Sequence, residues 1–92
     1  MASSFVQDKG EIIFYTWDFS DILDNYTIVS YTVTESSGHC IITNKTNTPT
    51  TVTALINTSN AEVTKLYRVV CNILTTNNER LEKTITIIIM EG

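Results

Sequence analysis

The sequence is poor in the residues on which most catalytic and metal-binding sites depend. It contains one histidine, two cysteines, one proline and three glycines in 92 residues. A structural zinc ion needs four ligands, and one histidine with two cysteines supplies too few. The glycines stand singly at positions 10, 38 and 92, so there is no glycine-rich loop to hold a phosphate. We therefore expect no metal and no cofactor.

The sequence also lacks a cluster of positive charge and a long hydrophobic run. Its six lysines and arginines are scattered and the net charge is −4, whereas a nucleic-acid-binding protein needs clustered cations. The longest apolar run, Ile87–Met90, is far shorter than the roughly 20 residues that span a bilayer. No secretory signal pattern is evident near the start. We expect neither nucleic acid nor membrane as a partner, and reduced Cys40 and Cys71 rather than a disulfide.

What the sequence has in excess is β-branched residues. Threonine occurs sixteen times, isoleucine twelve times and valine seven times, while alanine, the best helix former, occurs three times. Branched side chains fit a pleated sheet better than a helix. Hydrophobic residues make up 42% of the chain and charged residues 17%, which favours a folded domain over a disordered one.

Apolar and polar residues alternate in several short segments separated by turn residues. This alternation predicts strands near residues 11–19, 26–35, 39–44, 50–58, 65–76 and 80–90. Strands at this spacing predict an all-β fold, an immunoglobulin-like β-sandwich of about seven antiparallel strands over residues 11–92. Residues 1–10 are more polar, and we expect a flexible N-terminal segment there. Tyr67 lies where such folds place a tyrosine-corner residue, although simple core packing is the alternative.

The stretch YTWDFSDIL at residues 15–23 raises the question of a catalytic or metal-binding acid. Alternation places Trp17 and Phe19 on one face and Asp18 on the other, so Asp18 is expected to end a strand and to cap a turn or pair locally. One helical turn would follow, capped by Ser20 or Asp21.

Ile22 and Leu23 would then fold back onto the sandwich. A cation site made by Asp18, Asp21 and Asp24 is the alternative, although the glycine and distal glutamate of an EF-hand are absent. His39 and Cys40 are neighbours on a predicted strand, so their side chains point to opposite faces and do not form a nucleophilic pair. We expect no catalytic residue and no enzyme activity.

The stretch WDFSDIL and several short motifs along the chain resemble those of a family of small bacteriophage structural proteins. These are the fiber–tail adaptors or immunoglobulin-like virion proteins. The resemblance covers roughly residues 9–91. Its matching positions are Asp18, Phe19, Ser20, Leu23, Tyr67, Val69, Thr75, Thr76, Arg80, Thr84, Ile85 and Ile87. The chain departs from the family in two loops, where TSNAE (58–62) and NNE (77–79) replace glycine-containing turns.

The resemblance implies a non-enzymatic virion protein, assembled in the host cytoplasm, that connects tail or neck proteins to fibers. Its partners would be other virion proteins, and several copies would form a ring. Phe5 and Val6 are apolar residues in the polar N-terminal segment and could contact such a partner. A decoration protein of the particle is one alternative. A soluble adhesion or carbohydrate-recognition module is another, which would call for a secretory signal or exposed aromatics.

Overall fold

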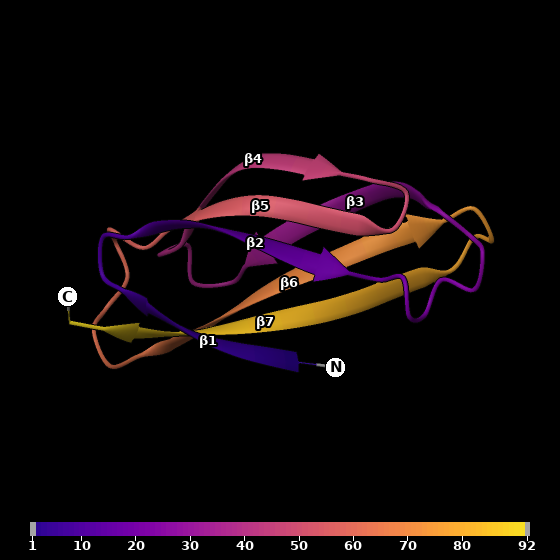
Figure 1. The fold of residues 1–92 in the computed structure, drawn as a ribbon. Coiled ribbons are helices and arrows are strands. Elements are labelled where there is room, and N and C mark those ends of the chain that lie inside the picture. The colour runs from indigo at the N-terminus through magenta and orange to yellow at the C-terminus, as the bar shows by residue number, and fades with distance from the viewer. Residues whose placement is uncertain (1, 92) are drawn as a thin grey trace.

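The strands predicted from alternation are present, together with one that the sequence did not indicate. The computed structural model describes residues 2–91, without the side chains of residues 2 and 3. Figure 1 shows the strands packed in two layers, and their bounds are β1 Ala2–Asp8, β2 Ile12–Asp18, β3 Ile28–Glu35, β4 Ile41–Asn47, β5 Thr51–Asn57, β6 Leu66–Thr75 and β7 Arg80–Met90. Within residues 2–91, no helix is long and apolar enough to cross a membrane.

The two layers are a four-stranded sheet, in the order β1-β7-β6-β3, and a three-stranded sheet, in the order β2-β5-β4. In the constant-type immunoglobulin sandwich, strands one, two, five and four form one sheet, and strands three, six and seven form the other. The present arrangement differs only in that the first strand has joined the opposite sheet. It is the immunoglobulin-like β-sandwich that the sequence predicts.

The sequence led us to expect antiparallel strands throughout. This expectation is wrong for one pair, because β1 pairs with β7 in parallel. Each residue from Ala2 to Asp8 has a partner in β7, and Figure 1 shows the two strands side by side. The chain then crosses to the other sheet through residues 9–11, where Gly10 takes a φ of 92°. This left-handed conformation favours glycine.

Residues 2–8 are therefore a strand of the sandwich instead of the flexible segment expected from their polar sequence. The physical reason is that Gln7 is fully buried and its side chain forms hydrogen bonds inside the sandwich. A buried amide is tolerated when its donors and acceptor are all paired. Met1 lies outside the described residues.

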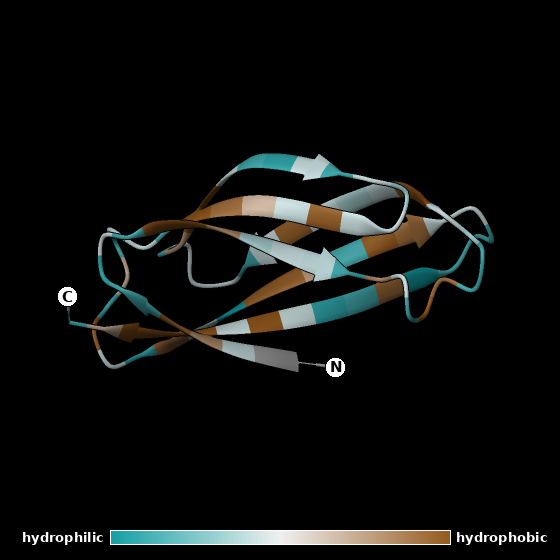
Figure 2. Cartoon of the chain, viewed as in Figure 1, coloured by the Kyte–Doolittle hydropathy of each residue, from teal (hydrophilic) through white to brown (hydrophobic). Residues whose placement is uncertain are grey.

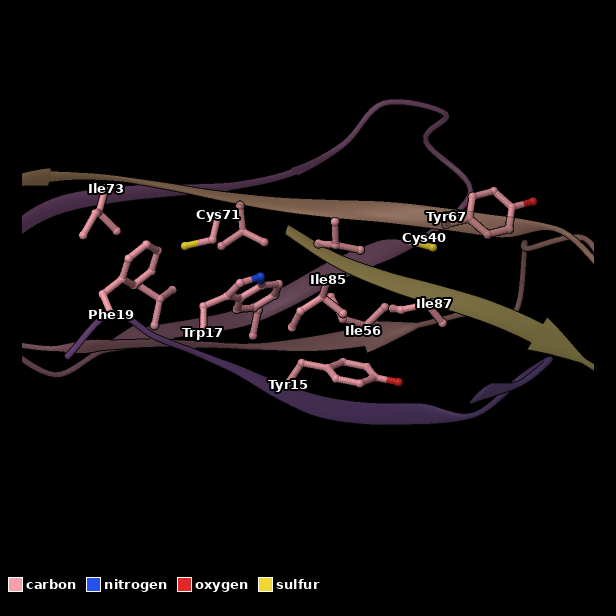
Figure 3. Close-up of a cluster of buried hydrophobic side chains, with 14 of the residues drawn as sticks. Tyr15, Trp17, Phe19, Cys40, Ile56, Tyr67, Cys71, Ile73, Ile85 and Ile87 are labelled. Carbon is pink, nitrogen blue, oxygen red and sulfur yellow. The ribbon is translucent and has the colours of Figure 1, made fainter. Parts of the chain in front are cut away.

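Side chains alternate between the core and the solvent along β5, β6 and β7. Figure 2 shows hydrophobic and hydrophilic residues interspersed along β5 and β7. The core lies between the sheets (Figure 3), and its fully buried members include Phe19, Val52, Ile56, Val69, Cys71, Ile87 and Ile89. Cys40 and Cys71 are both buried free thiols, which confirms the prediction from the sequence.

Candidate functional site

The end of β2 answers the question raised by YTWDFSDIL. Asp18 is the last residue of β2 and is exposed, and its Oδ1 accepts a hydrogen bond of 2.9 Å from the Ser20 N–H. Hydrogen bonding from Ser20, first by its side chain and second by its N–H, lowers the pKa of the Asp18 carboxyl. The N–H groups of Ile22 and Leu23 both donate to the Phe19 carbonyl oxygen, at 3.0 and 3.1 Å, which makes a single helical turn.

Asp18 thus ends a strand and caps a turn, which confirms the prediction for Asp18, whereas the prediction that Ser20 or Asp21 is the cap is wrong. Phe19 and Leu23 are buried in the core as expected, but Ile22 is 44% exposed and does not fold back. Asp18 and Phe19 point to opposite sides because side chains alternate along a strand. The arrangement is that of a structural turn.

Lys83 joins this turn to the other sheet, a role that the sequence did not indicate. Its Nζ donates to the Asp18 carbonyl oxygen at 2.7 Å and to Asp21 Oδ1 at 2.8 Å. It also lies 5.8 Å from the centroid of the Phe19 ring. The hydrogen bond from Lys83 lowers the pKa of Asp21. Asp21 therefore serves an ion pair, and over residues 2–91 no three acidic, histidine or cysteine side chains gather to hold a metal.

Tyr67 occupies the opposite end of the sandwich. Its Oη accepts a hydrogen bond of 2.9 Å from the N–H of Glu62, a few residues upstream and ahead of β6. This is the geometry of a tyrosine corner. His39 packs edge-on against the Tyr67 ring, with its Nδ1 3.3 Å from the Tyr67 Oη. Of the other family-motif residues, Val69 is fully buried in the core and Arg80 is exposed at the start of β7.

Glu35 organises the turn between β3 and β4, which sequence reasoning also missed. Its carboxylate accepts hydrogen bonds from the Ser37 N–H at 2.7 Å, the Ser37 Oγ–H at 2.8 Å and the Cys40 N–H at 3.1 Å. Partial burial opposes ionisation of Glu35, but these hydrogen bonds outweigh it and lower the pKa of the carboxyl. Glu35 borders a shallow cleft of about 290 Å³ that also includes His39, Lys65 and Arg68. Both charge signs line this cleft.

One apolar patch lies on the outer face of the four-stranded sheet. The pairing of β1, β7 and β6 places Val6, Ile88 and Leu66 in one row across three strands, with Met90 next along β7. Val6 is 64% exposed, and Leu66 and Met90 are also exposed. We call these four residues the four-strand patch. Phe5, the other predicted partner-contacting residue, is partly exposed and packs against the Tyr15 ring at a centroid distance of 5.2 Å.

A second apolar patch lies on the outer face of the three-stranded sheet. Phe14 pairs with Leu55, and Ile12 and Ile41 both pair with Asn57 from either side. Phe14 is 58% exposed, and Ile12 and Ile41 are exposed as well. We call Ile12, Phe14, Ile41 and Leu55 the three-strand patch. Neither these four residues nor their partner Asn57 carries a charge. The acidic groups that give the chain its net charge of −4 lie elsewhere.

A family of known proteins matches most of this chain. The family described as podophage GP4 fiber-tail adaptor protein gp77 matches residues 7–88. The chain belongs to this family. The match confirms the phage fiber–tail adaptor family that the motifs led us to expect. The protein is therefore a phage structural protein of the fiber–tail adaptor type. No curated protein matches the chain.

The matched range of the adaptor family includes the turn at Asp18, the tyrosine corner at Tyr67 and the three-strand patch. Phe5 and Val6 precede it. These two residues of β1 thus lie outside the part of the chain that matches the family.

Proposed function

We propose that this protein is a non-enzymatic virion adaptor that joins a fiber to the tail by binding one partner on each outer face of the sandwich. The observation that carries the proposal is the pair of apolar patches. They lie on the outer faces of two sheets packed back to back, so they point in opposite directions (Figure 1). Two proteins can therefore be bound at once.

The two patches also lie toward the same end of the molecule. Val6 precedes the turn at residues 9–11 and Ile12 follows it, so that turn connects the two patches. An adaptor with its two contacts on either side of one short turn holds its partners at a fixed separation. Because the core between the sheets is well filled by large side chains, the separation does not depend on a flexible linker.

Each patch is small, and its size bears on the number of copies. Burying one large apolar side chain contributes about 1.5–3 kcal/mol, whereas association costs about 4–15 kcal/mol in lost freedom of motion. A patch of four partly exposed side chains gives weak binding by itself. Several copies arranged as a ring around a tail or neck would raise the overall affinity through multivalency. The partners are other virion proteins, with no nucleic acid or membrane among them.

The compartment of assembly fits the same proposal. Both cysteines are buried free thiols, as expected of a protein that folds in a reducing host cytoplasm before it joins the virion.

The test is to purify particles of the phage that encodes the chain and to quantify the chain by mass spectrometry against the major capsid protein. A fixed low stoichiometry, equal to one or two rings, would support the adaptor. A copy number near that of the capsid protein would favour the alternative, a decoration protein. Absence from the particle would refute both.

The two faces are tested separately in the same particles. Phe14→Thr changes only the three-strand patch, and Leu66→Thr changes only the four-strand patch. The control variant is Ser4→Ala, at an exposed position of β1. The variant that damages the tail-binding face should be missing from the particle. The variant that damages the fiber-binding face should be incorporated in particles that lack fibers. Normal particles from both variants would contradict the two-face arrangement.

A further inference from the structure

We propose that the free edge of β2, together with the cleft beside it, binds an extended strand of a partner protein whose centre is uncharged and whose ends are basic. The strand would come from one of the two virion proteins that the adaptor joins, so this inference rests on the proposed function. It adds the site, the binding mode and the chemistry of the segment that is bound.

Strand β2 lies at an edge of its sheet, since the order is β2-β5-β4. At its two ends the Phe19 N–H donates to Thr50 O at 2.9 Å, and the Thr58 N–H donates to Glu11 O at 3.2 Å. Antiparallel pairing alternates, so the odd-numbered residues of β2 direct their main-chain groups toward β5. The main-chain groups of Ile12, Phe14 and Thr16 then face away from the sheet. Another extended segment matches donors and acceptors at this two-residue spacing.

The free edge of β2 lacks the features by which proteins usually protect an edge strand. Such features are bulges, prolines and charged side chains, lysine above all. Strand β4, at the other edge of the same sheet, has a bulge between Thr43 and Thr46 that contains Lys45. Strand β3 has a shift of register near its start. Strand β2 pairs with β5 without interruption, and its residues 12–17 include no charge and no proline.

A cleft of about 190 Å³ opens beside this edge, between β2 and the strands β1 and β7 of the other sheet. It is lined by Phe5, Thr16, Trp17, Asp18, Lys83, Thr84 and Ile85. Trp17 is 2% exposed, and its Nε1 is, in the described part of the chain, the one buried side-chain nitrogen or oxygen without a hydrogen-bond partner. Buried indole N–H groups usually have a partner. Because Trp17 lines the cleft, a side chain on the inner face of an added strand can enter the cleft beside the indole ring.

Charge decides between a second copy of this chain and a different protein. Glu11 and Asp18 flank the uncharged part of β2 and are both exposed. Antiparallel pairing of two copies along this edge would bring Glu11 of one copy within about one position of Asp18 of the other at both ends of the pair, on opposite faces of the sheet. Acidic groups of like charge would then gather at both ends, which disfavours such pairing. Lys83 lies near Asp18, but its ammonium is bound to Asp21. The edge therefore suits a foreign strand with lysine or arginine at both ends.

The test uses the isotope-labelled full chain in solution and a synthetic peptide of alternating threonine and valine with a lysine at each end. A second peptide with glutamate at each end is the matched control. The lysine peptide should slow hydrogen exchange of the Ile12, Phe14 and Thr16 amides and shift the indole N–H resonance of Trp17. It should bind about tenfold more tightly than the glutamate peptide, as expected when two surface charge pairs change from attraction to repulsion.

A pair of variants isolates the main-chain contact. Thr16→Pro removes one N–H from the free edge, and proline is tolerated on edge strands. Thr16→Val keeps that N–H and loses the same hydroxyl, which lies 2.9 Å from the Thr53 hydroxyl. Binding should be lost in Thr16→Pro and kept in Thr16→Val. If Thr16→Pro does not fold, the difference in binding between the lysine and glutamate peptides on the unchanged chain still tests the proposal.

Three results would overturn the proposal: no protection of the three amides, equal binding of the two peptides, or protection without peptide that disappears on dilution. The last would show that a second copy occupies the edge. Particles that contain the chain, together with a negative peptide result, would refute the edge site and leave the adaptor function standing. Particles without the chain would refute the adaptor function, whatever the peptides do.

Discussion

The Tyr15 Oη–H donates a hydrogen bond of 2.7 Å to Gln7 Oε1 inside the sandwich. Tyr15 belongs to β2 in the three-stranded sheet and Gln7 to β1 in the four-stranded sheet, so the bond connects the two layers. The Gln7 Nε2 group donates to the carbonyl oxygens of Glu11 at 2.8 Å and of Ile56 at 3.2 Å. Burial raises the pKa of Tyr15, whose hydroxyl stays protonated as the donor. This network fixes β1 to the rest of the fold.

Replacing the buried amide should therefore destabilise the whole domain. Gln7→Ala leaves the Tyr15 hydroxyl without its acceptor and removes one donor each from the Glu11 and Ile56 carbonyl oxygens. We expect a loss of about 2–4 kcal/mol in the free energy of unfolding. Urea denaturation monitored by circular dichroism measures this. Ser4→Ala, exposed on the same strand, is the control and should change stability by less than about 0.5 kcal/mol. A loss that small for Gln7→Ala would contradict a structural role for β1.

The tyrosine corner should contribute a smaller amount. Tyr67→Phe keeps the ring in place and leaves the Glu62 N–H without its acceptor, which we expect to cost about 1–2 kcal/mol. The comparison is Tyr26→Phe, because the Tyr26 side chain is exposed. Thermal unfolding of the two variants should show a lower melting temperature for Tyr67→Phe alone. Equal melting temperatures would mean that Tyr67 acts only by packing.

The turn at Glu35 should make stability depend on pH in the acid range. Its pKa is lower in the folded chain than the ordinary value of 4.5. The contribution of Glu35 is therefore present above about pH 4.5 and is lost as the pH falls through the folded-state pKa. Glu35→Gln should reduce the loss of stability between about pH 6 and pH 3. The matched change Glu82→Gln, at an exposed position on β7, should leave it unchanged, and a similar effect of both variants would contradict the assignment.

The two thiols should be unreactive in the folded protein. Burial raises the pKa of Cys71 to about 12, and burial with the nearby Glu35 carboxylate raises that of Cys40 to about 11. A thiol reagent at about pH 8 should label neither residue quickly in the native state and both in denaturant, because the thiolate is the reactive form. Single Cys→Ala variants identify each site. Rapid labelling of the native protein would contradict the burial of that thiol.

The same shifts have a consequence at high pH. Both thiols keep their protons in the folded state at pH values where the unfolded chain, with an ordinary pKa of 9.0, loses them. Stability should therefore fall as the pH rises above about 9 and continue to fall toward about 11. Cys71→Ala should weaken this dependence, as measured by urea denaturation at a series of pH values.

Most of the strands could be predicted from the sequence because side-chain alternation is a local property. The segment predicted at 65–76 is β6, Leu66–Thr75, and the one predicted at 80–90 is β7, Arg80–Met90. The end of β2 at Asp18 was also predictable, because the alternation of side chains gives way to polar turn residues within a few neighbouring positions. The amino-acid composition and the alternation of side chains were together sufficient to predict an all-β sandwich.

The candidate docking surfaces were only partly predictable. Val6 stands out as an apolar residue in a polar segment, but both faces of β2 read as apolar, with Ile12 and Phe14 on one and Ile13 and Tyr15 on the other. Alternation says that the two faces differ without saying which is inward. That depends on the sheet that packs against β2.

The tertiary structure alone decided which strands stand at the edges, where β1 lies, and which polar groups meet. Strand β1 has a polar sequence and becomes a strand because Gln7 finds partners in β2 and β5, more than forty positions away in the case of Ile56. Lys83 and Asp21 are separated by 62 positions and meet because the turn after β2 lies against β7 of the other sheet. Local periodicity is set by the pleat of a single strand, whereas these contacts exist only once the two sheets enclose a common core.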